Sequence, residues 1–290
     1  MPMNSIAPDL QQLATRSWLF TPATRPERFP NAAANGADVL IVDLEDSVAP
    51  ADKAAARSMA LDFVPRLGWR PGSPPPALTC ALRMNGIDSA SGLADWQAFI
   101  DSEADPSFLV VPKVDSPGHL QILDRLLSSA GKHTRLIAQI ESAQGLAQAE
   151  AIAVATPRLA GLMFGTADMA ADLGADLTWN SLLYARSRLI AAAALKGLLS
   201  IDAPFFAFKD VTRLVQETAN AVALGFSGKC AIHPSQIAVI NAALVPSGSE
   251  ISHARAVLQE NIKGVGVVNG VMVDEALARR ARRVLSRMRP

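Results

Sequence analysis

The segment RLIAQIESAQGLAQAEAIAVATPRLAGLMFGTAD, residues 135–168, contains two apolar runs that each end near an acidic residue. The first run ends at Glu141, and the second follows an alanine-rich stretch and leads to Asp168. Each carboxylate lies where a predicted strand gives way to a polar loop, in consecutive strand–helix units. Two carboxylates at one rim of a sheet can hold a divalent cation, which could polarise a keto or hydroxy acid.

Short β-rich runs alternate with alanine-rich helical runs over most of the chain. Strands are predicted at residues 17–22, 38–45, 78–85, 107–114, 135–141, 160–165, 198–203 and 228–233. Helices are predicted at residues 118–130, 144–155, 180–196 and 210–224. Eight strand–helix alternations predict an α/β protein whose parallel sheet closes into a (β/α)8 TIM barrel. An open doubly wound sheet is the main alternative, although no G-x-G-x-x-G motif follows the first strand.

Two further helices, at residues 250–262 and 274–288, exceed the eight units and are joined by KGVGVVNGVMVD. We therefore expect a catalytic barrel domain over residues 1–245 and a C-terminal helical extension over residues 246–290. The extension could cap the barrel or reach a neighbouring subunit. The proline-rich stretch 70–77 is predicted to be a surface connector.

Composition argues against several classes of partner. Half of the 290 residues are apolar, the formal net charge is zero and no basic stripe is visible, which argues against nucleic acid or an anionic membrane as partner. Cys80 and Cys230 lie in apolar runs and are interpreted as buried free thiols. Residues 1–16 contain no apolar signal core, and no run reaches the ~20 apolar residues of a membrane span. These features predict a cytoplasmic protein that acts on small molecules.

Side-chain alternation predicts which polar residues enter the barrel mouth, where active sites of this fold lie. In VLIVDLED, residues 39–46, Asp43 and Glu45 share a face, and Asp46 begins the following loop. The same alternation groups Arg83 with Ala81 and Asn85, Lys113 with Val111, and Gln139 with Glu141. Several strand ends thus direct charged or amide groups into one cavity, where charges need partners or a metal.

Each candidate also has a structural interpretation. Asp43, Glu45 and Asp46 could form a network with Arg25, Arg57 or Lys113. Glu141 could cap the helix that starts near Gln144, and Asp168 could N-cap the following turn. Lys113 could be only a salt-bridge partner, and His233 could make a structural hydrogen bond. Lys113 is the best candidate for a Schiff-base lysine, but neighbouring carboxylates would hold it protonated and oppose that use.

Several ordered motifs carry a family resemblance over residues 16–288. RSWLFTPATRPERFPNAAANGADVLIVDLEDSV, residues 16–48, resembles the opening signature of the citrate lyase β-subunit-like family of the HpcH/HpaI aldolase superfamily. IESAQG, FGTADMAADLG, AIHPSQI and NGVMVDEALARRARRVL are similar to its later motifs. The resemblance implies a (β/α)8 barrel, dependence on Mg2+, with Mn2+ as an alternative, and a homo-oligomer of three or six subunits. It also implies cleavage or formation of a C–C bond between an acyl-CoA and a keto acid.

The resemblance further implies roles for individual residues. Glu141 and Asp168 would ligate Mg2+, and Arg83 would hold the keto-acid carboxylate or the thioester oxygen. Glu45, with Asp43 and Asp46 nearby, would hold metal-bound waters. Arg25 and Lys113 would lie where the acid or CoA approaches. Asp274 matches an acid that in some relatives is the general base of a neighbour's active site; its structural interpretation is an N-cap of the last helix.

Two departures from the family pattern are present: TPATRP has Ala23 where relatives often have glycine, and IES replaces the commoner IET. The predicted reaction is a metal-assisted retro-Claisen or retro-aldol cleavage of a citryl-, malyl- or citramalyl-CoA. Three alternatives remain: a malyl-CoA-like thioesterase, a CoA-independent class II pyruvate aldolase, and a non-catalytic subunit of a lyase complex.

Overall fold

The structure is a computed structural model that describes residues 13–64, 78–262 and 264–288. The proline-rich stretch 70–77 lies outside the described residues, so its role as a connector stays a prediction. The chain divides into two compact units, residues 1–240 and 241–290, and the division falls inside helix α10 (Ile237–Leu244). The two units are described separately.

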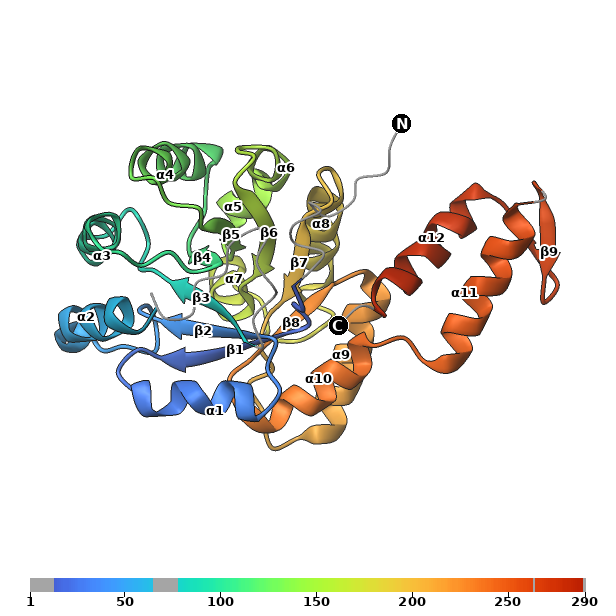
Figure 1. Cartoon of the computed structure of the whole chain (residues 1–290), viewed down its shortest axis with the longest axis horizontal. Helices are drawn as coiled ribbons and strands as arrows, with labels where there is room; N and C mark the ends of the chain where they lie inside the picture. Colours follow the sequence, from blue (N-terminus) through green and yellow to red (C-terminus); the bar gives the residue numbers. More distant parts are fainter. Residues whose placement is uncertain (1–12, 65–77, 263, 289–290) are drawn as a thin grey trace. The chain divides into compact units, whose positions relative to one another are not determined.

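The first unit contains a closed barrel of eight parallel strands (Figure 1). The strands are β1 (Ser17–Pro22), β2 (Val39–Asp43), β3 (Thr79–Arg83), β4 (Phe108–Val111), β5 (Arg135–Ile140), β6 (Leu159–Phe164), β7 (Leu199–Asp202) and β8 (Gly228–Ala231). Trp18 of β1 pairs with both Val39 of β2 and Cys230 of β8, which closes the ring. The predicted barrel is confirmed, and the open doubly wound alternative is wrong.

Helices surround the strands in Figure 1. They are α1 (Phe29–Ala34), α2 (Lys53–Phe63), α3 (Ala90–Asp101), α4 (Pro117–Ser129), α5 (Ala143–Ala147), α6 (Ala149–Ala153), α7 (Thr166–Leu173), α8 (Leu183–Ala194) and α9 (Val211–Leu224). Short 3-10 turns are η2 (Pro26–Arg28), η3 (Pro50–Asp52) and η5 (Pro234–Gln236). The single helix predicted at 144–155 is two helices, because the backbone at Gln148 (φ −103°, ψ 6°) leaves helical geometry. Among the described residues, no helix combines the length and apolar composition needed to cross a membrane.

Alternating apolar side chains fill the barrel interior. Val39 and Ile41 of β2 and Ala81 of β3 belong to one buried cluster, together with Phe108, Val110 and Ile137. Because side chains alternate along a strand, Asp43 and Arg83 continue the inward-facing rows at the carboxyl ends of β2 and β3. This confirms their predicted direction into the barrel mouth. For β4 the predicted grouping was wrong, because Val110 rather than Val111 faces the interior.

A second set of buried charges lies on the outward-facing row of β7 and β8. Lys229 Nζ donates to Asp202 Oδ2 at 2.6 Å and to Glu217 Oε1 at 3.1 Å, and Arg186 Nε donates to Asp202 Oδ1 at 3.0 Å. Burial alone would raise the pKa of Asp202, but the charges of Lys229 and Arg186 hold that pKa below its usual value. These ion pairs tie α8 and α9 to the two strands.

The second unit contains helices α11 (Gly248–Asn261) and α12 (Glu275–Ser286), joined by a hairpin of β9 (Gly266–Val268) and β10 (Val271–Val273). The sequence interpretation treated this link only as a connection between helices, and it missed the hairpin. Asn269 and Gly270 form its two-residue turn with φ values of 50° and 78°, as expected of an Asn-Gly type I′ turn. Val257, Val273 and Ala281 form part of the small core of this unit.

The buried cluster around Asp202 generates a stability prediction. Lys229→Met should lower the free energy of unfolding by about 3 kcal/mol, because it leaves a buried carboxylate with one cation fewer. Denaturant unfolding of the variant measures this loss. Lys196→Met, at an exposed lysine, is the matched control and should change stability by no more than about 0.5 kcal/mol. Equal stability of the two variants would contradict the assigned role.

Candidate active site

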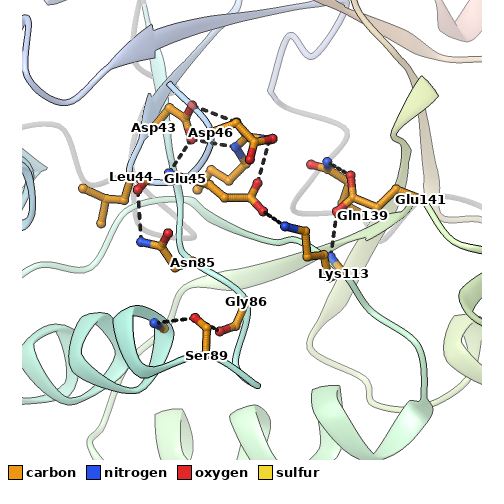
Figure 2. Close-up of polar contacts among 12 residues, drawn as sticks. Asp43, Leu44, Glu45, Asp46, Asn85, Gly86, Ser89, Lys113, Gln139 and Glu141 are labelled. Atoms are coloured by element: carbon orange, nitrogen blue, oxygen red, sulfur yellow. Dashed lines mark hydrogen bonds and ion pairs between the residues drawn. The ribbon is translucent and has the colours of Figure 1, made fainter. Parts of the chain in front are cut away.

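The carboxyl ends of neighbouring strands bring oppositely charged groups together at one rim of the barrel (Figure 2). Asp43 ends β2 and Arg83 ends β3, and Glu45 and Asp46 follow β2 directly. Lys113 lies two residues beyond β4, and Glu141 follows β5. Asp168 lies in the first turn of α7, after β6. Five consecutive strands therefore contribute to the site, as the alternation of strands and helices predicts.

Arg83 is the cation at the centre of this rim. Its guanidinium binds Asp43 through two hydrogen bonds, Nε to Oδ1 at 2.6 Å and Nη2 to Oδ2 at 2.7 Å. Nη1 lies 2.9 Å from Glu45 Oε2, and the guanidinium stacks 4.6 Å from the ring centroid of Phe20. Burial opposes its charge, but the surrounding carboxylates more than compensate and raise the pKa of Arg83.

Asp43 and Glu45 respond differently to this cation. Burial favours the neutral form of both acids, but the charge and hydrogen bonds of Arg83 hold the pKa of Asp43 below its usual value. For Glu45, burial and the nearby Asp46 outweigh the cations, so its pKa is raised. The predicted structural network therefore exists, but its cations are Arg83 and Lys113, whereas Arg57 pairs with Asp95.

Lys113 contacts two carboxylates through different groups (Figure 2). Its Nζ lies 3.1 Å from Glu45 Oε1, and its backbone N–H donates to Glu141 Oε1 at 2.8 Å. The residue has a φ of 54°, which is uncommon for a side chain other than glycine and is typical of functional sites. This local geometry breaks the strand alternation, which explains how Lys113 reaches the site although the grouping with Val111 was wrong.

Glu141 is almost fully buried and has an altered acidity. Its Oε2 accepts a hydrogen bond from Gln139 Nε2, and Gly165 packs directly against the carboxylate. Burial, followed by the negative charge of Glu45 and with a contribution from Asp168, raises its pKa to about 8. The helix-cap interpretations of both acids are wrong, because Ser142 caps α5 and Gly165 is the N-cap of α7.

The donor set fits a hard divalent cation. Glu45 and Asp168 both raise the cost of ionising Glu141, which is the electrostatic situation that a bound cation relieves. Within residues 13–64, 78–262 and 264–288, no group of three or more His, Cys, Asp or Glu side chains forms a ready-made metal cage. Mg2+ is commonly held by one or two carboxylates, with water and substrate as its remaining ligands. Glu141 and Asp168 are the two carboxylates that we propose for this role.

The other predicted residues have different surroundings. Arg25 is exposed before η2 and, in the described part of the chain, has no ion pair with the rim carboxylates. Asp274 lies in the second unit, where its Oδ1 accepts the Leu277 N–H at 3.0 Å and caps α12. His233 caps η5 and stacks on Phe208, which confirms its structural interpretation. A catalytic role for Arg25 or Asp274 stays a prediction.

Sequence reasoning missed three residues that support the rim. Lys53 donates to the carbonyls of Leu44 and Glu45, and Asp95 accepts from Asn85. Gly165 leaves the space that the Glu141 carboxylate occupies. The position of Lys53 could have indicated its role. It is the first residue of α2, where the helix dipole disfavours a cation, so a lysine there needs another reason.

A model of the HpcH/HpaI aldolase/citrate lyase family matches residues 16–234 of this chain, which include every rim residue described above. The chain belongs to this family. A second model, for C–C bond lyases of the TIM-barrel fold, matches residues 186–289. The predicted family is thus confirmed, and the chain is an enzyme of the carbon–carbon lyase class.

Individual relatives are similar over nearly the whole chain. The L-malyl-CoA/β-methylmalyl-CoA lyase of Cereibacter sphaeroides is 32% identical over 92% of each chain, and the citrate lyase subunit beta of Escherichia coli is 33% identical over 97% of each. RipC of Yersinia pestis is 50% identical, with a TM-score of 0.71 over 82% of this chain and 98% of that one. The protein CitE of Mycobacterium tuberculosis, in complex with magnesium, acetoacetate and coenzyme A, is 33% identical, with a TM-score of 0.79 over 96% and 99%.

The raised pKa of Glu141 predicts a pH-dependent stability of the metal-free protein. Below an ordinary glutamate pKa of 4.5 the acid is protonated in both folded and unfolded chains, whereas above about 8 it is ionised in a fold that disfavours the charge. Glu141→Gln should therefore stabilise the protein progressively as pH rises through this window. Thermal unfolding in EDTA at several pH values measures the effect. Glu27→Gln, at an exposed site, should show a flat difference, and a flat difference for Glu141→Gln would refute the assignment.

The contact between Gly165 and Glu141 predicts a glycine requirement. A Cβ at Gly165 would overlap Glu141 Oε2 and lie 2.5 Å from the Cβ of Glu141, so Gly165→Ala must displace the carboxylate. We expect divalent-cation affinity, measured by calorimetric Mg2+ titration, to fall about 10-fold or more. Gly248→Ala is the control, because a Cβ there meets no atom within 4 Å. Unchanged affinity in Gly165→Ala would show that Glu141 does not bind the cation.

Proposed function

We propose that this enzyme is a Mg2+-dependent lyase that cleaves a 3-hydroxyacyl-CoA of the citryl-, malyl- or citramalyl-CoA type into a keto acid and an acyl-CoA. One observation carries the proposal. The buried Glu141, whose pKa is raised to about 8, lies at the same rim as Asp168 and beside the Arg83–Glu45–Lys113 ion pairs. This arrangement offers a cation site next to fixed positive charge, as a reaction through an enolate requires.

The names of the relatives support both the cofactor and the substrate class. Two similar enzymes are named as lyases of citrate and of malyl-CoA or β-methylmalyl-CoA. A similar structure is described as a complex with magnesium, acetoacetate and coenzyme A. In this chain Glu141 and Asp168 would hold Mg2+, with Mn2+ as a substitute. When bound, the ion would act as a Lewis acid towards the substrate's oxygen atoms.

The remaining rim residues would bind and orient the substrate. Asp43 fixes the plane of the Arg83 guanidinium, which would hold a carboxylate or thioester oxygen on which negative charge develops. Glu45, held between Arg83 and Lys113, would orient water or a substrate hydroxyl by accepting a hydrogen bond from its O–H group. Lys113 and Arg25 would lie on the approach of the CoA thioester.

Removal of the hydroxyl proton requires a base. We propose Asp274 of a neighbouring subunit for this role, which implies a homo-oligomer, either a trimer or a hexamer. In support, the side chain is exposed and its Oδ1 is held by the Leu277 N–H, so the carboxylate has a defined orientation. The assembly, the reach of the second unit to a neighbour and a cytoplasmic location stay predictions.

A product assay tests the proposed reaction. Malyl-, citramalyl- and citryl-CoA are each incubated with the enzyme, with Mg2+ or with EDTA, and the products are identified by mass spectrometry. An EDTA-sensitive keto acid with a shorter acyl-CoA is expected. Glu141→Gln and Asp168→Asn should lower kcat by about 10²-fold or more, since metal-ion catalysis supplies several kcal/mol. Glu27→Gln is the control and should keep full activity.

Other outcomes of the same assay separate the alternatives. Free CoA with an intact hydroxy acid would indicate a thioesterase. Cleavage of free hydroxy acids without CoA would indicate a class II aldolase. Full activity of Glu141→Gln or Asp168→Asn would overturn the assignment of the metal ligands.

A further inference from the structure

Lys53 contacts the back of the acidic loop that carries Glu45. Its ammonium donates three hydrogen bonds, to Leu44 O at 2.8 Å, to Glu45 O at 2.7 Å and to Asn85 Oδ1 at 2.7 Å. An ammonium group has three N–H donors, so all of them are engaged with protein acceptors. Lys53 therefore has no donor left for a substrate, and its three bonds all act on the loops after β2 and β3.

A buried network of hydrogen bonds also fixes Leu44 and Asn85, the residues that Lys53 contacts. Asn85 Nδ2 donates to Leu44 O at 3.0 Å and to Asp95 Oδ2 at 2.6 Å. Asp95 is fully buried on α3, and its Oδ1 accepts from Arg57 Nε of α2 at 2.6 Å. Lys53 and Arg57 thus connect α2 to two loops and to α3, and they give the loop after β2 a rigid support.

Glu45 is held at several points, and its carbonyl accepts from the Val48 N–H at 3.0 Å as well as from Lys53. Its N–H donates to Asp43 Oδ1 at 3.0 Å, and its carboxylate lies between Arg83 and Lys113. Strand β2 ends at Asp43, so regular sheet pairing stops just before Glu45. The backbone bond from Leu44 N to Arg83 O, at 3.0 Å, is the last contact of this kind before Glu45.

We propose that Lys53 is a positioning residue of the active site: by holding the carbonyls of Leu44 and Glu45 it places the Glu45 carboxylate against Arg83 and Lys113. The placement of the lysine supports a functional rather than a helix-stabilising role. It opens α2, where the positive end of the helix dipole repels a cation. The catalytic consequence rests on the proposed lyase function, whereas the structural consequence does not.

The first test compares Lys53→Met with the control Lys196→Met in steady-state kinetics. A misplacement of about 1 Å in a catalytic constellation can cost about 10²-fold in rate. We expect kcat of Lys53→Met to fall by about that factor, while KM for the CoA thioester changes less than about 3-fold. A variant that is less stable but keeps wild-type kcat per folded molecule would show that the role is only structural, and would overturn the proposal. Should Lys53→Met not fold, Lys53→Arg takes its place, because it keeps the charge and the donors but changes their geometry. We expect kcat of Lys53→Arg to fall about 10-fold.

Chemical rescue provides a sharper readout. Lys53→Cys can be alkylated with 2-bromoethylamine, which rebuilds a lysine-like side chain carrying an ammonium group. The native Cys80 and Cys230 are buried, and burial raises the pKa of both thiols, so they stay unreactive in the folded protein. We expect alkylation to restore kcat to within about 5-fold of the wild type. Alkylated protein that stays as slow as Lys53→Cys would contradict the proposal.

A crystal structure of Lys53→Met decides the question independently of substrate. The Glu45 Oε2 to Arg83 Nη1 pair, 2.9 Å in the native chain, should be broken or shifted, while the Asp43–Arg83 pair remains. Glu45 in its native position would overturn the proposal. If instead the wild-type enzyme cleaves none of the CoA thioesters, the proposed function fails, and the crystallographic result still stands as the test of Lys53.

Discussion

The buried pair between Asp43 and Arg83 is the interaction on which the barrel mouth depends. Two carboxylate oxygens meet two guanidinium nitrogens across neighbouring strands, so both side chains are fixed in one plane. A buried charge without a partner is strongly destabilising, and each member of this pair therefore requires the other. The third guanidinium nitrogen, Nη1, does not bind Asp43 and instead faces Glu45.

The charges around this pair follow a gradient across the rim. On the side of β2 and β3, cations and carboxylates are balanced, and the pKa of Asp43 stays low. Towards β5 and β6 the carboxylates outnumber the cations, and the pKa of Glu141 rises to about 8. A divalent cation would restore the balance at that end. The protein thus separates a region in which opposite charges are balanced from one in which carboxylates are in excess.

Local pattern was enough to predict much of this arrangement. Apolar runs of strand length, separated by helical runs, predicted the eight strands, and alternation placed Asp43, Arg83 and Glu141 on inward faces. Prediction from local pattern was less successful where the backbone leaves regular geometry. Strand alternation alone would point Lys113 away from the barrel interior, but its positive φ turns the residue towards the site. The hairpin with the Asn-Gly turn at residues 269–270 was predicted only as a connection between two helices.

Periodicity and ordered motifs were enough to predict the closed barrel, the family and most of the charged residues of the rim. The side-chain partners are defined only in three dimensions: Arg83 pairs with Asp43, Lys113 pairs with Glu45, and Lys53 and Asn85 support the loop behind them. Their pairing joins residues up to 68 positions apart, from Glu45 to Lys113. Which charges meet depends on how the ends of different strands come together and on burial, and local spacing along the chain encodes neither.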